Sequence, residues 1–302
     1  MTFRLSKNRI ASLGRKKLMS WFLSTAMVLL IFEVVFIFIF PYIYMLVNSL
    51  KYEVDLVDSS TRWIITKINW DNYKKAFTLI DFWGGMRTNI IISLLCGVGH
   101  VLSCSLIGYG LARFRFKGRN FIFMMVIVSL IVPPQIFSIP LYMQYTRIGW
   151  IGQIWPIVVP SFFGFGLKGG LFVFIFRQYY MGLPKSYEEA ARVEGCNNFS
   201  IFVRIILPIS SSSILVTTIL SVVWHWNDYF EPRTFLTGKT QMITQMIPIL
   251  NSWKNVVATS SGIALSQSAL AACVMSTLPL LVMYIIFQRR FISGVEHSGL
   301  AN

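Results

Sequence analysis

Long runs of apolar residues constrain this chain more than any other feature of its sequence. An α-helix needs about 20 apolar residues to cross the hydrocarbon core of a bilayer, because each residue adds only about 1.5 Å. Six segments come close to this length or exceed it. They run from Trp21 to Leu50, Thr88 to Leu111, Phe121 to Tyr142, Ile154 to Phe176, Ile209 to Trp226 and Gly262 to Phe287. The sequence therefore predicts an all-α membrane protein with six transmembrane helices.

The overall composition argues for the same class. Hydrophobic residues make up 55% and charged residues 13% of the 302 residues, and the mean hydropathy is +0.63. Soluble domains carry about 25% charged residues, so a soluble globular enzyme is not expected. The four cysteines form no CxxC pair, and they are predicted to pack as small hydrophobic residues; they are Cys96, Cys104, Cys196 and Cys273.

The distribution of the net charge of +15 predicts the orientation in the membrane. Basic residues without acidic ones fill the first twenty residues and the link between the second and third spans, whereas the links 51–87 and 143–153 are mixed or nearly uncharged. By the positive-inside rule, both termini lie in the cytoplasm. The first apolar run is too long for a cleavable signal peptide. Because the basic residues border the membrane, nucleic-acid binding is not expected.

These assignments divide the chain into a small number of segments. They are a basic cytoplasmic tail (1–20), a first transmembrane helix (21–50), an extracytoplasmic link (51–87), a five-helix core (88–288) and a cytoplasmic C-terminal tail (289–302). The core contains one cytoplasmic segment, residues 177–208, that is strongly helical in character.

Within the segment 177–208, the sequence predicts a short capped helix. Ser186 and Glu189 have the spacing of a capping box, with Ser186 as the N-cap. Gly195 is placed to end the helix in a left-handed conformation. The expected helix covers about residues 187–194.

The residues of this helix leave two interpretations open. Glu188 and Glu189 lie at the positive end of the helix dipole, and a second helix is expected to enter the membrane at Pro208. The segment could be a simple connector between two spans. It could instead be a docking element, because the small side chains of Ala190 and Ala191 allow a partner to approach closely.

A resemblance favours the docking element. The run Glu189-Ala190-Ala191, three residues, Gly195, nine residues, Ile205, one residue, Leu207-Pro208 resembles the EAA signature of ABC-importer permeases at every position. Other motifs are similar to the carbohydrate (maltose-type) branch of these permeases: Asn72-Tyr73, Trp226-Asn227-Asp228, and Arg290-Phe291 followed by Ser293-Gly294. The likeness covers about residues 70–295. The tail from Val295 to Gly299 departs from the family pattern, so its insertion into an ATPase dimer is not inferred.

The resemblance implies a fold, partners and a function. The fold would be MetI-like, in the bacterial cytoplasmic membrane, with a second homologous permease subunit, two ABC ATPase subunits and an extracytoplasmic solute-binding protein as partners. The cargo would be oligosaccharides, and acidic ones would be included if Lys168, discussed below, faces the substrate path. ATP and magnesium would be bound by the partner ATPases, and no cofactor or metal is expected in this chain. The residues implied in coupling to the ATPases are Ser186, Glu188, Glu189, Ala190, Ala191, Gly195, Leu207 and Pro208.

The chain shows no energy source of its own. Its only Gly-Lys-Thr run, residues 238–240, lacks the first glycine of a P-loop, because position 233 is Arg233. A stand-alone carrier or channel is the main alternative to a non-catalytic importer subunit. An intramembrane enzyme using Asp228, His225 or Glu33 is the other, although these residues form no nucleophile–base or paired-acid arrangement in the sequence.

Four residues are candidates for the substrate path, each with a structural alternative. Lys168 in mid-membrane costs about 2.5–3.5 kcal/mol without water or a partner. It either snorkels or pairs structurally, or faces an anionic or hydroxyl-rich substrate. Trp224 and Trp226 form either an interfacial aromatic belt or a sugar-stacking surface, and Asn227 lies beside them. The identity of the sugar does not follow from the sequence.

Overall fold

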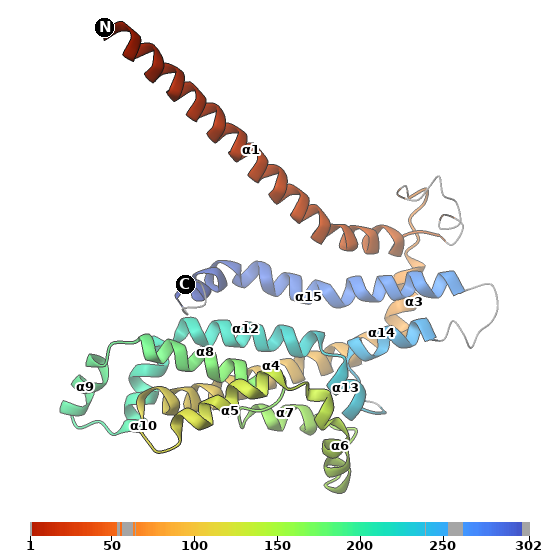
Figure 1. Cartoon of the computed structure of the whole chain (residues 1–302). Coiled ribbons are helices and arrows are strands. Elements are labelled where there is room, and N and C mark those ends of the chain that lie inside the picture. Colours follow the sequence, from red (N-terminus) through yellow and green to blue (C-terminus); the bar gives the residue numbers. More distant parts are fainter. Residues whose placement is uncertain are drawn as a thin grey trace.

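All regular elements in the described part of the chain are helices (Figure 1). The computed structural model describes residues 2–52, 55, 63, 65–238, 240–252 and 262–297. The first half contains α1 (Thr2–Ser49), α3 (Asp71–Leu79), α4 (Phe82–Arg113), α5 (Arg119–Ile131), the 3-10 helix η2 (Pro134–Phe137) and α6 (Ser138–Arg147). The second half contains α7 (Trp155–Ser161), α8 (Gly169–Gly182), α9 (Ser186–Val193), α10 (Asn198–Ile201), the π-helix η3 (Phe202–Ile206), α11 (Leu207–Ile209), α12 (Ser211–Asn227), α13 (Phe230–Phe235), α14 (Ile243–Ser252) and α15 (Gly262–His297). The predicted all-α class is confirmed.

Helix α4 is the central element of the bundle, because each of three buried clusters includes residues of it. One cluster joins α4 to α8, α9, α10 and η3, the second to α3, α12, α14 and α15, and the third to α6, α7 and α13. Gly108 allows α4 and α8 to approach closely. A β-carbon at Gly108 would lie 2.7 Å from the Phe176 β-carbon and 2.9 Å from the Arg177 nitrogen. Such small residues at helix contacts are typical of membrane bundles.

Five of the six predicted spans correspond to helices or bent helix pairs. Three single helices are long and apolar enough to cross a membrane: Met19–Ser49, Phe82–Arg113 and Gln267–Arg290. Two further candidates are bent pairs, Arg119–Ile131 with Pro134–Arg147 at 95°, and Asn198–Ile209 with Ser211–Asn227 at 76°. The described residues thus hold three candidate spans, or up to five if each bent pair is one span, and the count of six is not confirmed.

The predicted fourth span, Ile154 to Phe176, is wrong as a continuous helix. The chain forms α7, leaves the helical conformation over residues 162–168, and begins α8 at Gly169. The physical reason lies in the backbone: Gly164, Gly166 and Lys168 have φ angles of 74°, 85° and 64°. Each of these left-handed residues interrupts a right-handed helix. We call residues 162–168 the break loop.

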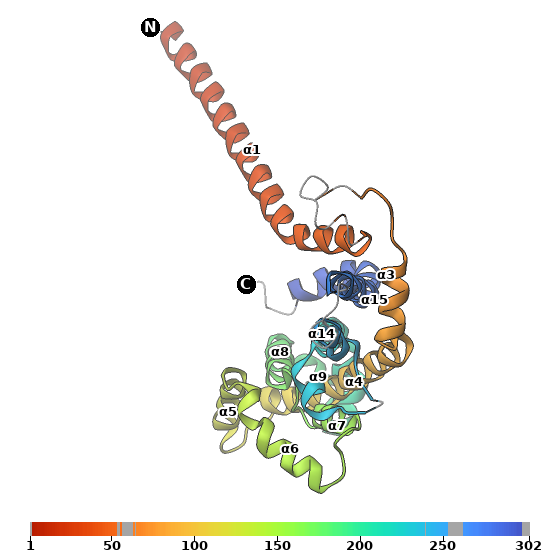
Figure 2. The ribbon, with the colours of Figure 1, turned by 90° about the vertical axis from the view of Figure 1, so that its right-hand side faces the viewer.

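Helix α1 stands apart from the bundle in both views (Figures 1 and 2). None of the most apolar stretch of Met19–Ser49 is buried within the chain. Hydrogen bonds hold the chain at the end of α1: the Asn72 amide donates to the Ser49 and Lys51 carbonyls at 2.9 Å each, and the Gln267 amide to the Lys51 carbonyl at 2.8 Å. Because α1 begins at Thr2 and α15 ends at His297, most of each predicted tail is helical and continuous with a span.

Candidate functional site

Helix α9 forms at the predicted place but without the predicted cap. Leu183, which precedes Pro184, is extended with ψ 139°, as expected for a residue before proline. The backbone of Lys185 is already helical, and its carbonyl accepts hydrogen bonds from the Glu188 and Glu189 nitrogens at 3.0 and 3.1 Å. Ser186 is therefore the first helical residue and lacks the extended backbone that an N-cap needs. The predicted capping box between Ser186 and Glu189 is not formed.

The end of α9 follows the prediction closely. Gly195 has a φ of 82°. Its nitrogen donates to the Arg192 carbonyl at 3.0 Å, and the Cys196 nitrogen donates to the Ala191 carbonyl at 3.0 Å. These two bonds make a Schellman motif, which requires a left-handed residue at the position of Gly195.

The two faces of α9 have different environments. Ser186, Glu189 and Ala190 are exposed. Glu188 and Ala191 are buried at 4% and 3% exposure, and Ala191 belongs to the cluster that joins α4, α8 and α10. Of the two alanines expected to contact a partner, only Ala190 is therefore accessible.

An ion pair fixes the buried face of α9 to the end of α4. The Nε of Arg113 lies 2.8 Å from Oε1 of Glu188, and the two side chains are only 6% and 5% exposed. The Arg113 Nη2 also donates to the Leu183 carbonyl at 2.7 Å, and Arg192 approaches the other Glu188 oxygen at 3.6 Å. Sequence reasoning missed this contact, because 75 residues separate Arg113 from Glu188 and a basic residue at the end of a span is read as a membrane border.

A bent segment connects α9 to α12. It consists of α10, η3 and α11, with the half-buried Leu207 and the exposed Pro208 just before the 76° bend. The Asn197 side chain accepts a hydrogen bond from the Ser200 nitrogen at 2.8 Å and caps α10. The Tyr179 hydroxyl of α8 donates to the Ile209 carbonyl at 2.9 Å, so the bend is held against the bundle.

Of the four candidate path residues, the structure brings two together. The Lys168 Nζ lies 5.9 Å from the centre of the Trp224 ring, and Lys168 is exposed at the end of the break loop. Trp226 points to a different side of α12, where it is 5% exposed and its Nε1 donates to the Ser276 carbonyl of α15 at 3.1 Å. Asn227 is exposed and donates to the Val223 carbonyl of its own helix. Trp226 therefore does not share a surface with Lys168, whereas Asn227 lies one helical turn beyond Trp224.

His100 of α4 holds the break loop in place. Its Nε2 lies 2.9 Å from the Phe165 carbonyl, to which it donates, and its Nδ1 lies 2.9 Å from the Ser221 hydroxyl of α12. His225 contacts the Ser221 carbonyl at 2.8 Å, and the two imidazole rings are 5.4 Å apart. Both histidines are therefore helix residues that are hydrogen-bonded inside the bundle. Within the described residues, no group of three or more His, Cys, Asp or Glu could hold a metal ion.

Two carboxyl groups follow the end of α12. The Asp228 carboxylate accepts a hydrogen bond from the Phe230 nitrogen at 3.0 Å. Burial raises the pKa of Glu231 from its ordinary value of 4.5 to about 8, and the nearby Asp228 carboxylate contributes to this rise. Burial also raises the pKa of Asp228. Since burial favours the neutral form, Glu231 keeps its proton around neutral pH.

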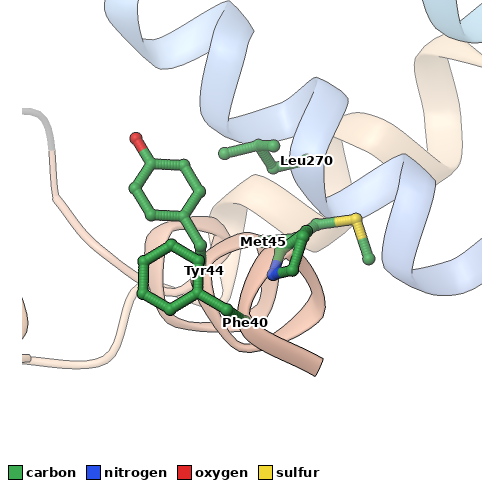
Figure 3. Close-up of a pocket in the computed structure, with 5 residues that line it drawn as sticks. Phe40, Tyr44, Met45 and Leu270 are labelled. Carbon is green, nitrogen blue, oxygen red and sulfur yellow. The ribbon is translucent and has the colours of Figure 1, made fainter. Parts of the chain in front are cut away.

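A cavity of about 440 Å³ lies between α1 and α15 (Figure 3). It is lined by Phe40, Pro41, Tyr44, Met45 and Leu270. This lining offers a single hydroxyl group, whereas recognition of a polar ligand needs several placed polar groups. The cavity is therefore a poor candidate for a sugar site.

Comparison with protein families gives one match over most of the bundle. Residues 105–297 match the family described as "Binding-protein-dependent transport system inner membrane component". The matched region begins within α4 and includes α8, α9 and α12.

Curated relatives extend the likeness to nearly the whole chain. An arabinooligosaccharides transport system permease protein, AraQ, from Halalkalibacterium halodurans is 28% identical over 292 residues, covering 94% of this chain and 97% of the relative. The protein of the same description from Bacillus subtilis is 30% identical over 270 residues, covering 87% and 91%. A diacetylchitobiose uptake system permease protein, DasC, from Streptomyces coelicolor is 26% identical over 264 residues, covering 87% and 91%.

Among solved structures, the fold is shared by a bacterial transporter chain. A chain of a bacterial ABC transporter involved in the import of the acidic polysaccharide alginate superposes with a TM-score of 0.72. It covers 87% of this chain and 94% of its own length at 19% sequence identity.

Proposed function

Because this chain belongs to the family of binding-protein-dependent transport system inner membrane components, we propose that it is the permease subunit of an ATP-driven importer of oligosaccharides. In this role the chain binds and hydrolyses no nucleotide. ATP and magnesium are bound by two partner ATPase subunits, a second homologous permease completes the path, and an extracytoplasmic solute-binding protein delivers the cargo. The chain is a multi-pass protein of the inner membrane, with both termini in the cytoplasm.

The observation that supports this proposal best is the construction of α9. A short helix with an exposed Glu189–Ala190 surface lies at one end of the bundle (Figure 1), in contact with Arg113 at the end of α4. Its buried face is fixed by Glu188 and Ala191, so the exposed face is presented rigidly. An ATPase that binds a rigid, exposed helix can displace it as a unit.

The cargo class rests on the relatives and on the break loop. Two similar permeases are described as belonging to arabinooligosaccharides transport systems. In this chain, the exposed ammonium of Lys168 lies near the Trp224 ring. An aromatic ring offers an apolar face for stacking, and an ammonium group donates to carboxylate or hydroxyl oxygens. We assign Lys168 and Trp224 to the path, where they accept neutral and acidic oligosaccharides.

Co-purification tests the proposal. A tagged copy expressed with its neighbouring genes is expected to purify with two ATPase subunits and a second permease, and the complex to import an oligosaccharide only with ATP and the binding protein. The chain alone in proteoliposomes is expected to be inactive. Uptake by the chain alone would instead identify a stand-alone carrier or channel.

A further inference from the structure

The contacts of Arg113 suggest how a displacement of α9 reaches the membrane core, an inference that rests on the proposed function. The covalent route runs from α9 through α10, η3 and α11 to α12. It passes a π-helical stretch and the 76° bend. Both features can absorb a displacement, because π-helical and bent segments are points of local adjustment.

The second route is non-covalent and short. Arg113 is the last residue of α4 and contacts both sides of the α8–α9 connection. Its guanidinium pairs with Glu188 at 2.8 Å inside α9 and donates to the Leu183 carbonyl at 2.7 Å just before α9. The ion pair is almost fully shielded from water, with side-chain exposures of 6% and 5%. A buried ion pair gains little as a stabiliser over apolar packing, but it fixes one geometry.

The non-covalent route continues from Arg113 along α4. His100 is thirteen residues before Arg113, about 20 Å along the helix. It contacts the Phe165 carbonyl of the break loop and the Ser221 hydroxyl of α12, each at 2.9 Å. One continuous helix therefore connects the buried face of α9 to the loop that carries Lys168.

We propose that Arg113 is a positioning residue for energy coupling: its ion pair with Glu188 makes α9 and α4 move as one body, and α4 carries the movement to the break loop. The exposed Glu189–Ala190 face receives the displacement, and the Arg113–Glu188 pair transmits it. Arg113 itself touches neither nucleotide nor substrate.

Neutralising the pair in the assembled importer tests this assignment. The variants are Arg113→Gln, Glu188→Gln and the double variant, with the exposed Glu194→Gln as the matched control. Each is purified with its partner subunits, and ATP hydrolysis and uptake are measured on the same preparation. In the double variant, no uncompensated buried charge remains, so assembly is expected to recover. Uptake by the double variant is nevertheless expected to stay at least about tenfold below wild type while ATP hydrolysis continues, because the link is gone. Arg113→Lys, which keeps the charge but has one nitrogen where Arg113 uses two, is expected to retain more uptake than Arg113→Gln and less than wild type.

The outcomes separate the possibilities. If the double variant assembles and transports like wild type, the pair only balances charge and the proposal is overturned. The same holds if the double variant is missing from the membrane, since the pair is then a folding contact. If uptake is lost at unchanged hydrolysis and Glu194→Gln is normal, the proposal is supported. A wild-type complex without an ATPase would overturn the proposed function itself.

Discussion

At the scale of single residues, Gly195 has the most specific backbone requirement in the segment 177–208. Its φ of 82° belongs to a Schellman motif, and a β-carbon added there would meet nothing within 4 Å, so a substitution acts through the backbone alone. A left-handed conformation costs a non-glycine residue about 1–2 kcal/mol. Gly195→Asp is expected to shift the end of α9 and reduce uptake to background, while the protein remains in the membrane. Quantitative membrane blots together with uptake assays measure this.

The control for Gly195 is Gly182. It also has open space around it but no left-handed backbone. Gly182→Ala is expected to leave uptake unchanged. Normal uptake by Gly195→Asp would count against a coupling role for α9.

A substitution at Lys168 tests which class of oligosaccharide, acidic or neutral, this residue recognises. The substitution Lys168→Ala removes the ammonium group. It is expected to reduce uptake of an acidic oligosaccharide by about tenfold, equivalent to about 1.4 kcal/mol, and to reduce uptake of a neutral oligosaccharide much less. Competition assays with matched neutral and acidic cargo measure the ratio. The exposed Lys117→Ala at the turn before α5 serves as the control. An equal loss for both sugars would indicate a structural role for Lys168.

Glu231 makes the stability of the protein depend on pH. Its pKa is about 8 in the folded chain and is raised from 4.5 by burial and then by Asp228. Between these values the folded state keeps the proton and the unfolded state loses it. The free energy of unfolding is therefore expected to fall by about 1.4 kcal/mol per pH unit as the pH rises through this window, and to level off above it. Glu231→Gln should remove this contribution.

Thermal unfolding in detergent between pH 5 and pH 9 measures the difference between wild type and Glu231→Gln. The variant is expected to unfold at a higher temperature than wild type at pH 8, and the two should converge near pH 5. Glu194→Gln, at an exposed position, should follow the wild-type curve. A difference between the two proteins that does not change between pH 5 and pH 9 would show that Glu231 is ionised in the folded state.

At the scale of elements, the sequence predicted those helices whose position follows from the length of an apolar run or from the residues that begin and end a helix. Uninterrupted apolar runs predicted α4 and α15, and the spacing from Pro184 to Gly195 predicted α9. The break loop was not predicted, because hydropathy does not report backbone conformation: Phe162 to Leu167 is as apolar as a helix would be. The contact between Arg113 and Glu188 was not predicted either, because it depends on how α4 and α9 meet in space.

The contact between α4 and α8 provides a matched pair of substitutions on one helix. Gly108→Ala would place its β-carbon 2.7 Å from Phe176, whereas at Gly110 nothing lies within 4 Å. Overpacking of this kind costs about 1–3 kcal/mol, so Gly108→Ala should lower the unfolding temperature in detergent. Gly110→Ala should be neutral or slightly stabilising, since alanine favours helix over glycine. Equal effects at both positions would mean that α4 and α8 are not in close contact.

At the scale of the whole molecule, the three buried clusters show that one helix, α4, contacts other elements along the length of the bundle. Each cluster includes residues of α4; α8 and α12 pack directly against this helix, and α15 packs against α12 and α14. Helix α1 contributes little to this core and leaves its apolar side chains exposed. In a membrane protein these side chains face lipid or another subunit. The core of the bundle therefore forms largely without α1. Apolar runs in the sequence alone could not show this difference between α1 and the other helices.

The orientation of the molecule is the last property that can be tested directly. The turn before α5 is rich in basic residues, whereas residues 143–153 carry only Arg147. The positive-inside rule therefore places Lys117 in the cytoplasm and Gln153 outside. Both residues are exposed, and they flank the pair of helices that bend by 95°. In a background without the four native cysteines, Gln153→Cys is expected to react with a membrane-impermeant maleimide in intact cells, and Lys117→Cys only after permeabilisation. If both cysteines react from one side, the bent pair is a re-entrant loop that does not cross the membrane. If the two sides are reversed, α9 lies outside the cell, where no ATPase could reach it, and the proposed function fails.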